Sequence, residues 1–101
     1  MTASVSETLY LTAAFYKFVS LPDYASRRGP LLAFCEAHNV KGLILLAEEG
    51  INSTIAGAPA DVHAVLSYLR SDPLLADLEH KESFATKAPF HRMKVRLKKE
   101  I

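Results

Sequence analysis

The sequence has little cysteine, little glycine and no long apolar run, and each shortage excludes a class of protein. The single cysteine, Cys35, excludes an internal disulfide and a cysteine-rich zinc site. The longest uninterrupted apolar runs are Leu31–Cys35 and Leu43–Ala47, far short of the ~20 residues that a transmembrane helix needs. The four glycines form neither a Walker loop nor a dinucleotide-binding fingerprint. We therefore expect a reduced, cytoplasmic protein without a membrane contact.

The rest of the composition is typical of one globular domain. Half of the 101 residues are apolar and 23% are charged, which argues against disordered and low-complexity chains. No positive charge followed by an apolar stretch opens the sequence, so no secretory signal is expected. Residues 1–10, rich in Ser and Thr, are predicted to form a flexible leader, and residues 11–101 a single domain.

The formal net charge of +1 hides an asymmetry along the chain. Residues 1–91 hold seven basic and ten acidic side chains, a net charge of −3, whereas residues 92–101 hold five basic and one acidic, a net charge of +4. An anionic partner would therefore be met locally, near the C-terminal residues.

Apolar periodicity predicts five strands and two helices. The strands are expected at Thr12–Val19, Lys41–Ala47, Ile51–Gly57, Leu78–Phe84 and Arg92–Leu97. Because Lys41–Ala47 is apolar after its first two residues, it is expected to be a central strand buried on both faces. The polar content of Leu78–Phe84 favours an edge strand.

Proline positions determine where the helices are expected. Proline costs ~3 kcal/mol inside a helix but almost nothing at its first position, so the first helix is predicted at about Pro30–His38, after an irregular turn or short helical piece. The second is predicted from Pro59 to the break at Asp72-Pro73. Its apolar stripe consists of Val62, Val65, Leu66 and Leu69. The order βαββαβ plus a final strand predicts an α+β, ferredoxin-like (acylphosphatase-like) sandwich, with two helices on one face of a mainly antiparallel sheet.

Candidate catalytic residues are scarce. Cys35 lies mid-helix, where a small buried hydrophobe is more common than a nucleophile. The four histidines lie in four different elements without metal-ligand spacing, so only a composite metal site remains open. Glu48 and Glu49 fall on a turn and are expected to diverge into water. An acylphosphatase activity is rejected, because the loop from Val19 to Tyr24 has no glycine for a phosphate cradle, and a lone Asn52 is weak evidence.

A basic row is the one informative feature for binding. It consists of Arg92, Lys94, Arg96 and Lys98, which alternate with Met93, Val95 and Leu97. In a strand the four cations stand ~6.6 Å apart on one face. Such a row suits the phosphates of an extended nucleic-acid strand, but a charged edge strand that prevents aggregation explains the charges equally well. Aromatic stacking platforms are not evident beside the row, although Phe90 precedes it.

Three motifs together resemble one family. They are FYKFV at residues 15–19, LAEEGINSTIAG at residues 46–57 and FHRMKVRLKKEI at residues 90–101. Their order and spacing are similar to the N-terminal domain of the oxygen-dependent tRNA uridine hydroxylases of the TrhO type, which carry a rhodanese domain. Ser53 departs from the family, which usually has glycine there; a serine costs little if its φ is negative.

The resemblance implies a function for the full-length protein. The family hydroxylates the wobble uridine of tRNA to 5-hydroxyuridine, with molecular oxygen as co-substrate, and has its reactive cysteine in a following rhodanese domain. That domain is absent from this chain, so no catalytic residue carries over to it and no cofactor is expected in it. Expected partners are tRNA, through its anticodon region, and the protein's own rhodanese domain.

Two hypotheses follow, with a weaker third. In the first, the basic row contacts tRNA phosphates, with Glu49, Asn52 and His91 as candidates for polar contacts. In the second, the domain only packs on the rhodanese domain or self-associates. Cations exposed beside Lys17 or Lys81 would favour RNA, and pairing with Glu79 or Glu82 would favour packing. A small-molecule sensor would require an apolar pocket between sheet and helices.

Overall fold

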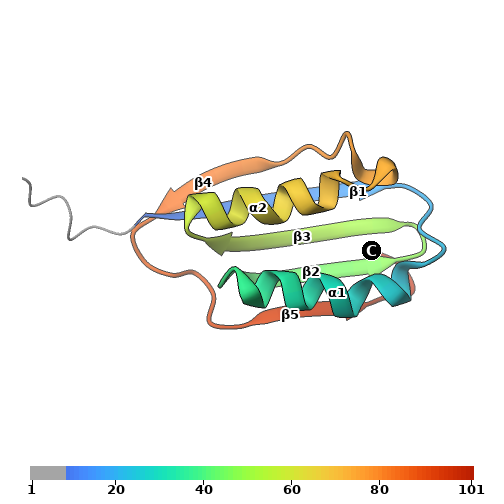
Figure 1. The fold of residues 1–101 in the computed structure, drawn as a ribbon, viewed down its shortest axis with the longest axis horizontal. Helices are drawn as coiled ribbons and strands as arrows, with labels where there is room; N and C mark the ends of the chain where they lie inside the picture. The colour runs from blue at the N-terminus through green and yellow to red at the C-terminus, as the bar shows by residue number, and fades with distance from the viewer. Residues whose placement is uncertain (1–8) are drawn as a thin grey trace, which may run out of the picture.

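The computed structural model describes residues 9–101 as a five-stranded sheet with two helices on one face (Figure 1). In chain order the elements are β1 Tyr10–Phe18, α1 Tyr24–Ala37, β2 Lys41–Ala47, β3 Gly50–Gly57, α2 Pro59–Arg70, a short 3-10 helix Pro73–Leu75, β4 Lys81–Ala85 and β5 Met93–Leu97. The strand order is β4-β1-β3-β2-β5, and every neighbouring pair is antiparallel except β2–β5. The predicted α+β ferredoxin-like arrangement is confirmed.

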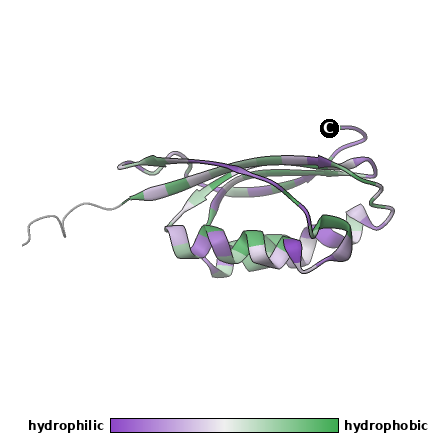
Figure 2. Ribbon diagram, turned by 90° about the horizontal axis from the view of Figure 1, so that it is seen from above, coloured by the Kyte–Doolittle hydropathy of each residue, from purple (hydrophilic) through white to green (hydrophobic). Residues whose placement is uncertain are grey.

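The hydrophobic core lies between the helices and one face of the sheet. Both helices lie on the same side, and within residues 9–101 the opposite face of the sheet carries no helix (Figure 2). The predicted stripe of α2 is buried, and α1 contributes Leu31 and Cys35. The strands contribute alternate residues: Leu11, Ala13, Phe15, Ile44, Leu46, Ile51, Ile55 and Val95. None of the described helices is long and apolar enough to cross a membrane.

The first helix begins earlier than expected, at Tyr24, and contains Pro30 in its interior. Proline removes the hydrogen bond to the carbonyl four residues earlier, here that of Ser26. Both residues are exposed, so water can solvate that carbonyl. An ion pair between Arg27 and Asp23 within the first turn stabilises the early start, and Arg27 also reaches Asp72. The predicted stop at Asn39 is confirmed, because Asn39 has a φ of 56°.

The β2 strand has the predicted bounds but not the predicted burial. Ile44 and Leu46 face the helices and are buried, whereas Leu43 is 37% exposed and Leu45 is partly buried. The cause is that the helices cover only one face of the sheet, so every second residue of this apolar strand, including Leu43 and Leu45, lies on the other face. The prediction that this strand is buried on both faces is therefore wrong. Leu43 and Leu45 lie on the side of the sheet that has no helices.

Three smaller expectations have mixed outcomes. The expected leader falls mostly on residues 1–8, which lie outside the described residues, and β1 already begins at Tyr10. The β4 strand is an edge strand as predicted but begins at Lys81. Ser53 has no positive φ, so it fits where the family has glycine. It is 5% exposed, and its hydroxyl has no hydrogen-bond partner among the described residues.

Candidate nucleic-acid interface

The face of the sheet without helices, called here the open face, is built by strand register. Tyr16 of β1 lies opposite Asn52 of β3. Asn52 lies opposite Leu45 of β2, and Leu45 lies opposite Arg96 of β5. The next row along the strands runs through Lys81, Ala14, Thr54, Leu43 and Lys94. Residues far apart in the sequence thus form one continuous surface across all five strands.

The basic row occupies one edge of the open face. Lys94 and Arg96 belong to β5, and the ladder continues at both ends, because Gly42 N–H donates to the Arg92 carbonyl at 2.8 Å and Lys98 N–H donates to the Leu46 carbonyl at 2.8 Å. All four side chains are exposed, and together with Leu43 and Leu45 they line a shallow groove of about 670 Å³. The predicted alternation is confirmed for Val95, which is buried, but Leu97 remains 41% exposed.

The open face is cationic beyond the basic row. Lys41 of β2 and Lys81 of β4 point to the same face by register. Among the described strand residues on this face there is no aspartate or glutamate. Within residues 9–101, neither these two lysines nor the basic row forms an ion pair.

The groups expected to distinguish RNA binding from packing fall on both sides of the sheet. Lys81 joins the basic row on the open face, whereas Lys17 pairs with Asp77 at 3.0 Å. Glu82 faces the helices and contacts two histidines, and it does not contact the basic row. Glu79 lines a surface hollow beside Lys81 on the open face but forms no ion pair within residues 9–101. Neither glutamate is therefore paired with the basic row.

The three candidates for polar contacts are not equally placed. Asn52 is exposed in the centre of the open face. His91 is exposed in the loop before β5 and lines the groove beside Phe90. Glu49 lies on the β2–β3 turn, and its Oε1 accepts a hydrogen bond from the backbone of Ile101 at 2.6 Å. Their contact with RNA stays a prediction.

Two aromatic residues of the open face were missed in the sequence. Tyr16 and Phe18 of β1 are 66% and 65% exposed, and their ring centroids lie 5.9 Å apart. In the sequence they indicated only a strand, because β1 carries aromatic residues on both faces and Phe15 is the buried one. The register of β1 with β3 is needed to tell the buried aromatic residue from the two exposed ones.

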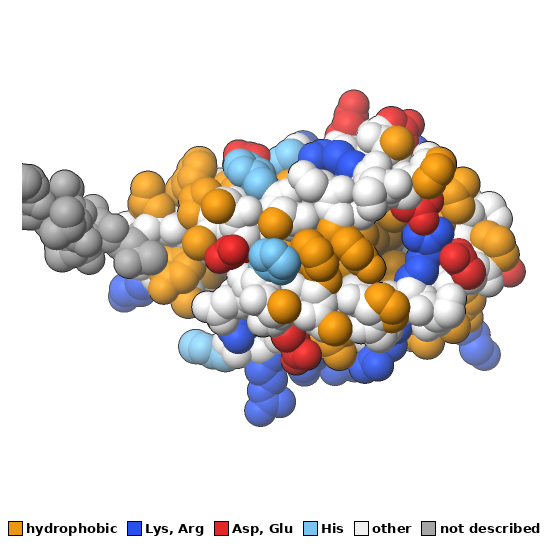
Figure 3. Space-filling model, viewed as in Figure 1, with side chains coloured by type: hydrophobic (Ala, Val, Ile, Leu, Met, Phe, Trp, Pro, Cys, Tyr) orange, Lys and Arg blue, Asp and Glu red, His pale blue; other side chains and the backbone are white. Residues whose placement is uncertain are grey.

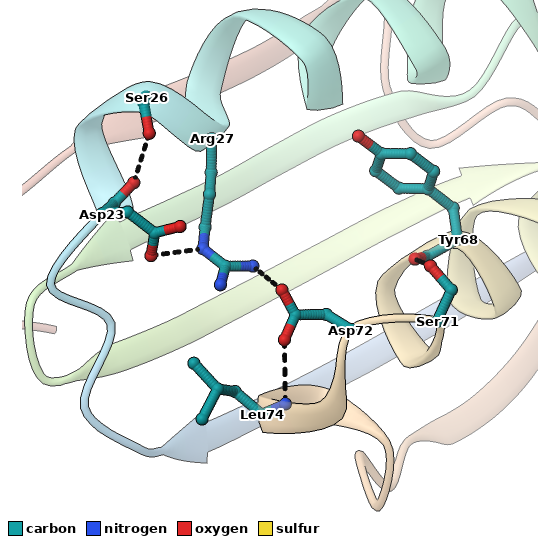
Figure 4. A network of polar contacts seen from close by, with 7 residues as sticks. All are labelled: Asp23, Ser26, Arg27, Tyr68, Ser71, Asp72 and Leu74. Atoms are coloured by element: carbon teal, nitrogen blue, oxygen red, sulfur yellow. Dashed lines mark hydrogen bonds and ion pairs between the residues drawn. The ribbon is translucent and has the colours of Figure 1, made fainter.

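The loop between β1 and α1 has no free phosphate cradle. The N–H groups of Val19 and Leu21 donate to carbonyls of the β2–β3 turn, at 3.0 and 2.7 Å. Arg27 is paired with Asp23 and Asp72, as Figure 4 shows. The pKa of the Asp72 carboxyl is lowered, first by a hydrogen bond from the Leu74 N–H and then by Arg27. These internal contacts occupy two backbone N–H groups of the loop and the guanidinium group nearest to it in the sequence.

The helix side offers less for a ligand. Figure 3 shows this side, where apolar side chains line the space between α1 and α2. A cleft of about 480 Å³ lies there, and its charged rim consists of the already paired Asp23, Arg27 and Asp72. Cys35 is buried as expected, and burial, with a smaller effect of Glu36, raises the pKa of its thiol to about 12. The thiol is therefore protonated at neutral pH and is a poor nucleophile.

The fold brings together a cluster that the sequence left open. His63 of α2, Glu82 of β4 and His80, which directly precedes β4, have ligand atoms within 4.8 Å of one another. Arg70 Nη2 lies 2.8 Å from His80 Nδ1, so that nitrogen accepts and the ring proton sits on Nε2, 2.6 Å from Glu82. A metal-binding histidine instead directs its second N–H at an acceptor. The cluster therefore favours a hydrogen-bonded link between β4 and α2 over a metal site.

This link predicts a pH-dependent contribution to stability. Hydrogen bonds from His80 and then His63 lower the pKa of Glu82 below its ordinary value of 4.5. The contribution is thus fully present above pH 4.5 and is lost as the pH falls through the lowered pKa. Glu82→Gln is expected to lower the urea midpoint at pH 7 but not at pH 3. Glu79→Gln, at an exposed neighbour, is the control, and an equal deficit at both pH values would contradict the link.

The geometry defines a small α+β domain with one helix-covered face and one cationic, aromatic face. The chain belongs to the family described as UPF0176 acylphosphatase like domain, which matches residues 10–101. A tRNA uridine(34) hydroxylase of Albidiferax ferrireducens is 70% identical over 94 residues, 93% of this chain and 30% of that protein. The protein of the same name from Acaryochloris marina is 61% identical, over 91% of this chain and 30% of that protein. The chain thus spans about 30% of the relatives it matches.

Solved structures support the fold alone. Full-length HypF in its phosphate- and nucleotide-bound form matches with a TM-score of 0.61 at 12% identity, over 93% of this chain and 12% of that one. The BlrP1 BLUF structure matches with a TM-score of 0.68 at 17% identity, over 88% of this chain and 64% of that one.

Proposed function

We propose that this chain is the N-terminal domain of a tRNA uridine(34) hydroxylase and that its open face contacts the tRNA. The whole enzyme would hydroxylate the wobble uridine in the cytoplasm, with molecular oxygen as co-substrate and the chemistry in a following rhodanese domain. Relatives carrying that name at 70% and 61% identity support the activity. This domain contributes binding and no catalytic residue.

The charge of the open face carries the proposal for RNA contact. Six cations share this face, whose described strand residues include no acidic side chain: Lys41, Lys81, Arg92, Lys94, Arg96 and Lys98. Along β5 the cations repeat at ~6.6 Å. Cations that neutralise phosphates release condensed counterions, which gives affinity without reading sequence.

The structural alternative has less support. Protection of an edge strand accounts for cations on β5, which is an edge strand. It does not account for Lys41, because β2 is an interior strand. Within residues 9–101 the basic row forms no ion pair, so its cations are available to an anionic partner.

Salt dependence tests the proposal. The double variant Lys94→Ala/Arg96→Ala is expected to bind an anticodon stem-loop more weakly, and its slope of log K against log salt should fall by about 1.4 to 1.8, for two lost phosphate contacts. The control Lys87→Ala/Lys99→Ala removes the same charge from exposed positions outside the open-face strands and should leave the slope nearly unchanged. Fluorescence anisotropy at several salt concentrations measures both. An unchanged affinity and slope in the first variant would overturn RNA contact through the basic row.

A further inference from the structure

Within residues 9–101, two aromatic residues of the open face, Tyr16 and Phe18, lie outside the hydrophobic core. Tyr16 and Phe18 lie on the part of β1 that continues past the β4 ladder and pairs with β3 alone, and they are 66% and 65% exposed. Burial of aromatic side chains would stabilise the fold, whereas exposed aromatic groups are typical of binding surfaces. Their position outside the core therefore indicates contact with a ligand or partner. The helix-side neighbour Phe15 is 4% exposed, which shows that β1 can bury an aromatic residue where the core requires one.

The aromatic pair and the basic row form the two sides of one platform. Register places Tyr16, Asn52, Leu45 and Arg96 in a single line across four strands. Three strand spacings separate β1 from β5, about 14 Å. Between them the surface offers amide and hydroxyl groups from Asn52 and Thr54 and apolar area from Leu43. A cationic edge, a polar centre and exposed rings match in order the phosphate, sugar and base of a nucleotide strand.

We propose that Tyr16 and Phe18 stack on unpaired bases, so that the open face takes a single-stranded RNA segment in preference to a paired stem. This inference rests on the proposed RNA contact and names the part of the RNA involved. Bases in an A-form stem are stacked on their neighbours, and only loops and ends present a free base plane to an aromatic ring. The two rings stand at 73° to one another, so one base cannot stack on both and each ring offers a separate face.

A protein partner fits this surface less well. Within residues 9–101 the open-face strands carry cations and no acid, and Glu79, in the loop before β4, is the acid that borders this face beside Tyr16 and Lys81. A protein partner would have to be both strongly acidic and apolar, whereas a single-stranded RNA supplies phosphates and base planes together. The absence of acids on the described open-face strands therefore favours RNA over a second protein surface.

Two RNA probes separate stacking from charge. Tyr16→Ala/Phe18→Ala is expected to weaken binding of a short oligouridine about 10-fold, with an unchanged salt slope and little change for a blunt RNA duplex of similar charge. Tyr16→Phe retains a ring and should bind like the parent chain. Phe84→Ala is the matched control, because Phe84 is 59% exposed but pairs with the core residue Leu11 and lies on the other face. Thermal melts followed by circular dichroism verify that each variant folds.

A spectroscopic readout is independent of affinity. The sequence has no tryptophan, so Tyr16→Trp introduces a single indole on the open face. Oligouridine should quench its fluorescence, while the same RNA should leave Phe84→Trp unquenched.

The possible outcomes are distinct. If Tyr16→Ala/Phe18→Ala loses affinity for oligouridine and for the duplex equally, the stacking proposal is overturned. It is also overturned if this variant retains the parental affinity for oligouridine. If the variant binds RNA normally but changes the sedimentation coefficient of the chain, the open face is a protein interface and the stacking proposal is again overturned. If the basic-row variant loses affinity while the aromatic variant does not, RNA contact stands without stacking. If the parent chain binds neither RNA, the proposed RNA contact itself fails.

Discussion

Replacing Gly50 by alanine is expected to destabilise the protein by about 3 kcal/mol or more, a loss large enough to unfold many domains of this size. Gly50 has a φ of +147°, a conformation that residues with a side chain rarely adopt. A Cβ there would also collide with the carbonyl oxygen of Lys17 on the paired strand β1. Neither atom can move without breaking the β1–β3 ladder, so the strain cannot relax locally.

Gly29 provides the matched control for this prediction. It lies in the exposed part of α1, and a Cβ there would have nothing within 4 Å. Gly29→Ala is therefore expected to stabilise the protein by about 0.5 to 1 kcal/mol through helix propensity. Urea and thermal unfolding measure both variants, and about 3 kcal/mol corresponds to a fall in Tm of more than about 12 °C. A Gly50→Ala variant that melts within a few degrees of the parent would show that the turn tolerates a side chain.

The strain at Gly50 matters for the open face. The turn before Gly50 supplies the carbonyls that accept from Val19 and Leu21, and Gly50 itself lies opposite Phe18. A displaced turn would therefore disturb the aromatic end of the open face together with the entry to α1.

Sequence periodicity predicts a helix or strand well where the element buries a single face. The apolar stripe of α2 and the alternation of β5 were predicted from spacing, because a single buried face imposes one period on each. The basic row could be recognised for the same reason, because its four cations stand at every second position of one short segment. The ferredoxin-like arrangement followed from the βαββαβ pattern and the handedness of crossovers.

Features that depend on pairing between distant segments were not predictable. Whether Tyr16 or Phe15 faces the core is decided by register with β3. The cluster of His63, His80 and Glu82 forms only when β4 packs beside α2, so its histidines looked unrelated in the sequence. Pro30 misplaced the start of α1, because the Ser26 carbonyl that it leaves without a helical hydrogen bond is exposed to water, which the sequence alone does not show.

The largest functional effect is expected from reversing the whole basic row. Changing Arg92, Lys94, Arg96 and Lys98 to glutamate turns the six open-face cations into two cations and four acids. Loss of four phosphate contacts alone weakens RNA binding by roughly three orders of magnitude near 0.1 M salt. In cells whose complete gene carries this variant, 5-hydroxyuridine in tRNA should fall to the level of a deletion strain.

Mass spectrometry of tRNA nucleosides measures this effect, with immunoblots to show that the variant protein accumulates. The control variant Lys87→Glu/Lys99→Glu should retain the parental amount of 5-hydroxyuridine, because these residues lie outside the open-face strands. A deletion that leaves 5-hydroxyuridine unchanged would contradict the assigned activity. If the deletion removes 5-hydroxyuridine but the variant with the reversed basic row retains it, the domain would instead be assigned to packing on the rest of the enzyme. The two comparisons thus separate what the whole protein does from what this face of the sheet contributes to it.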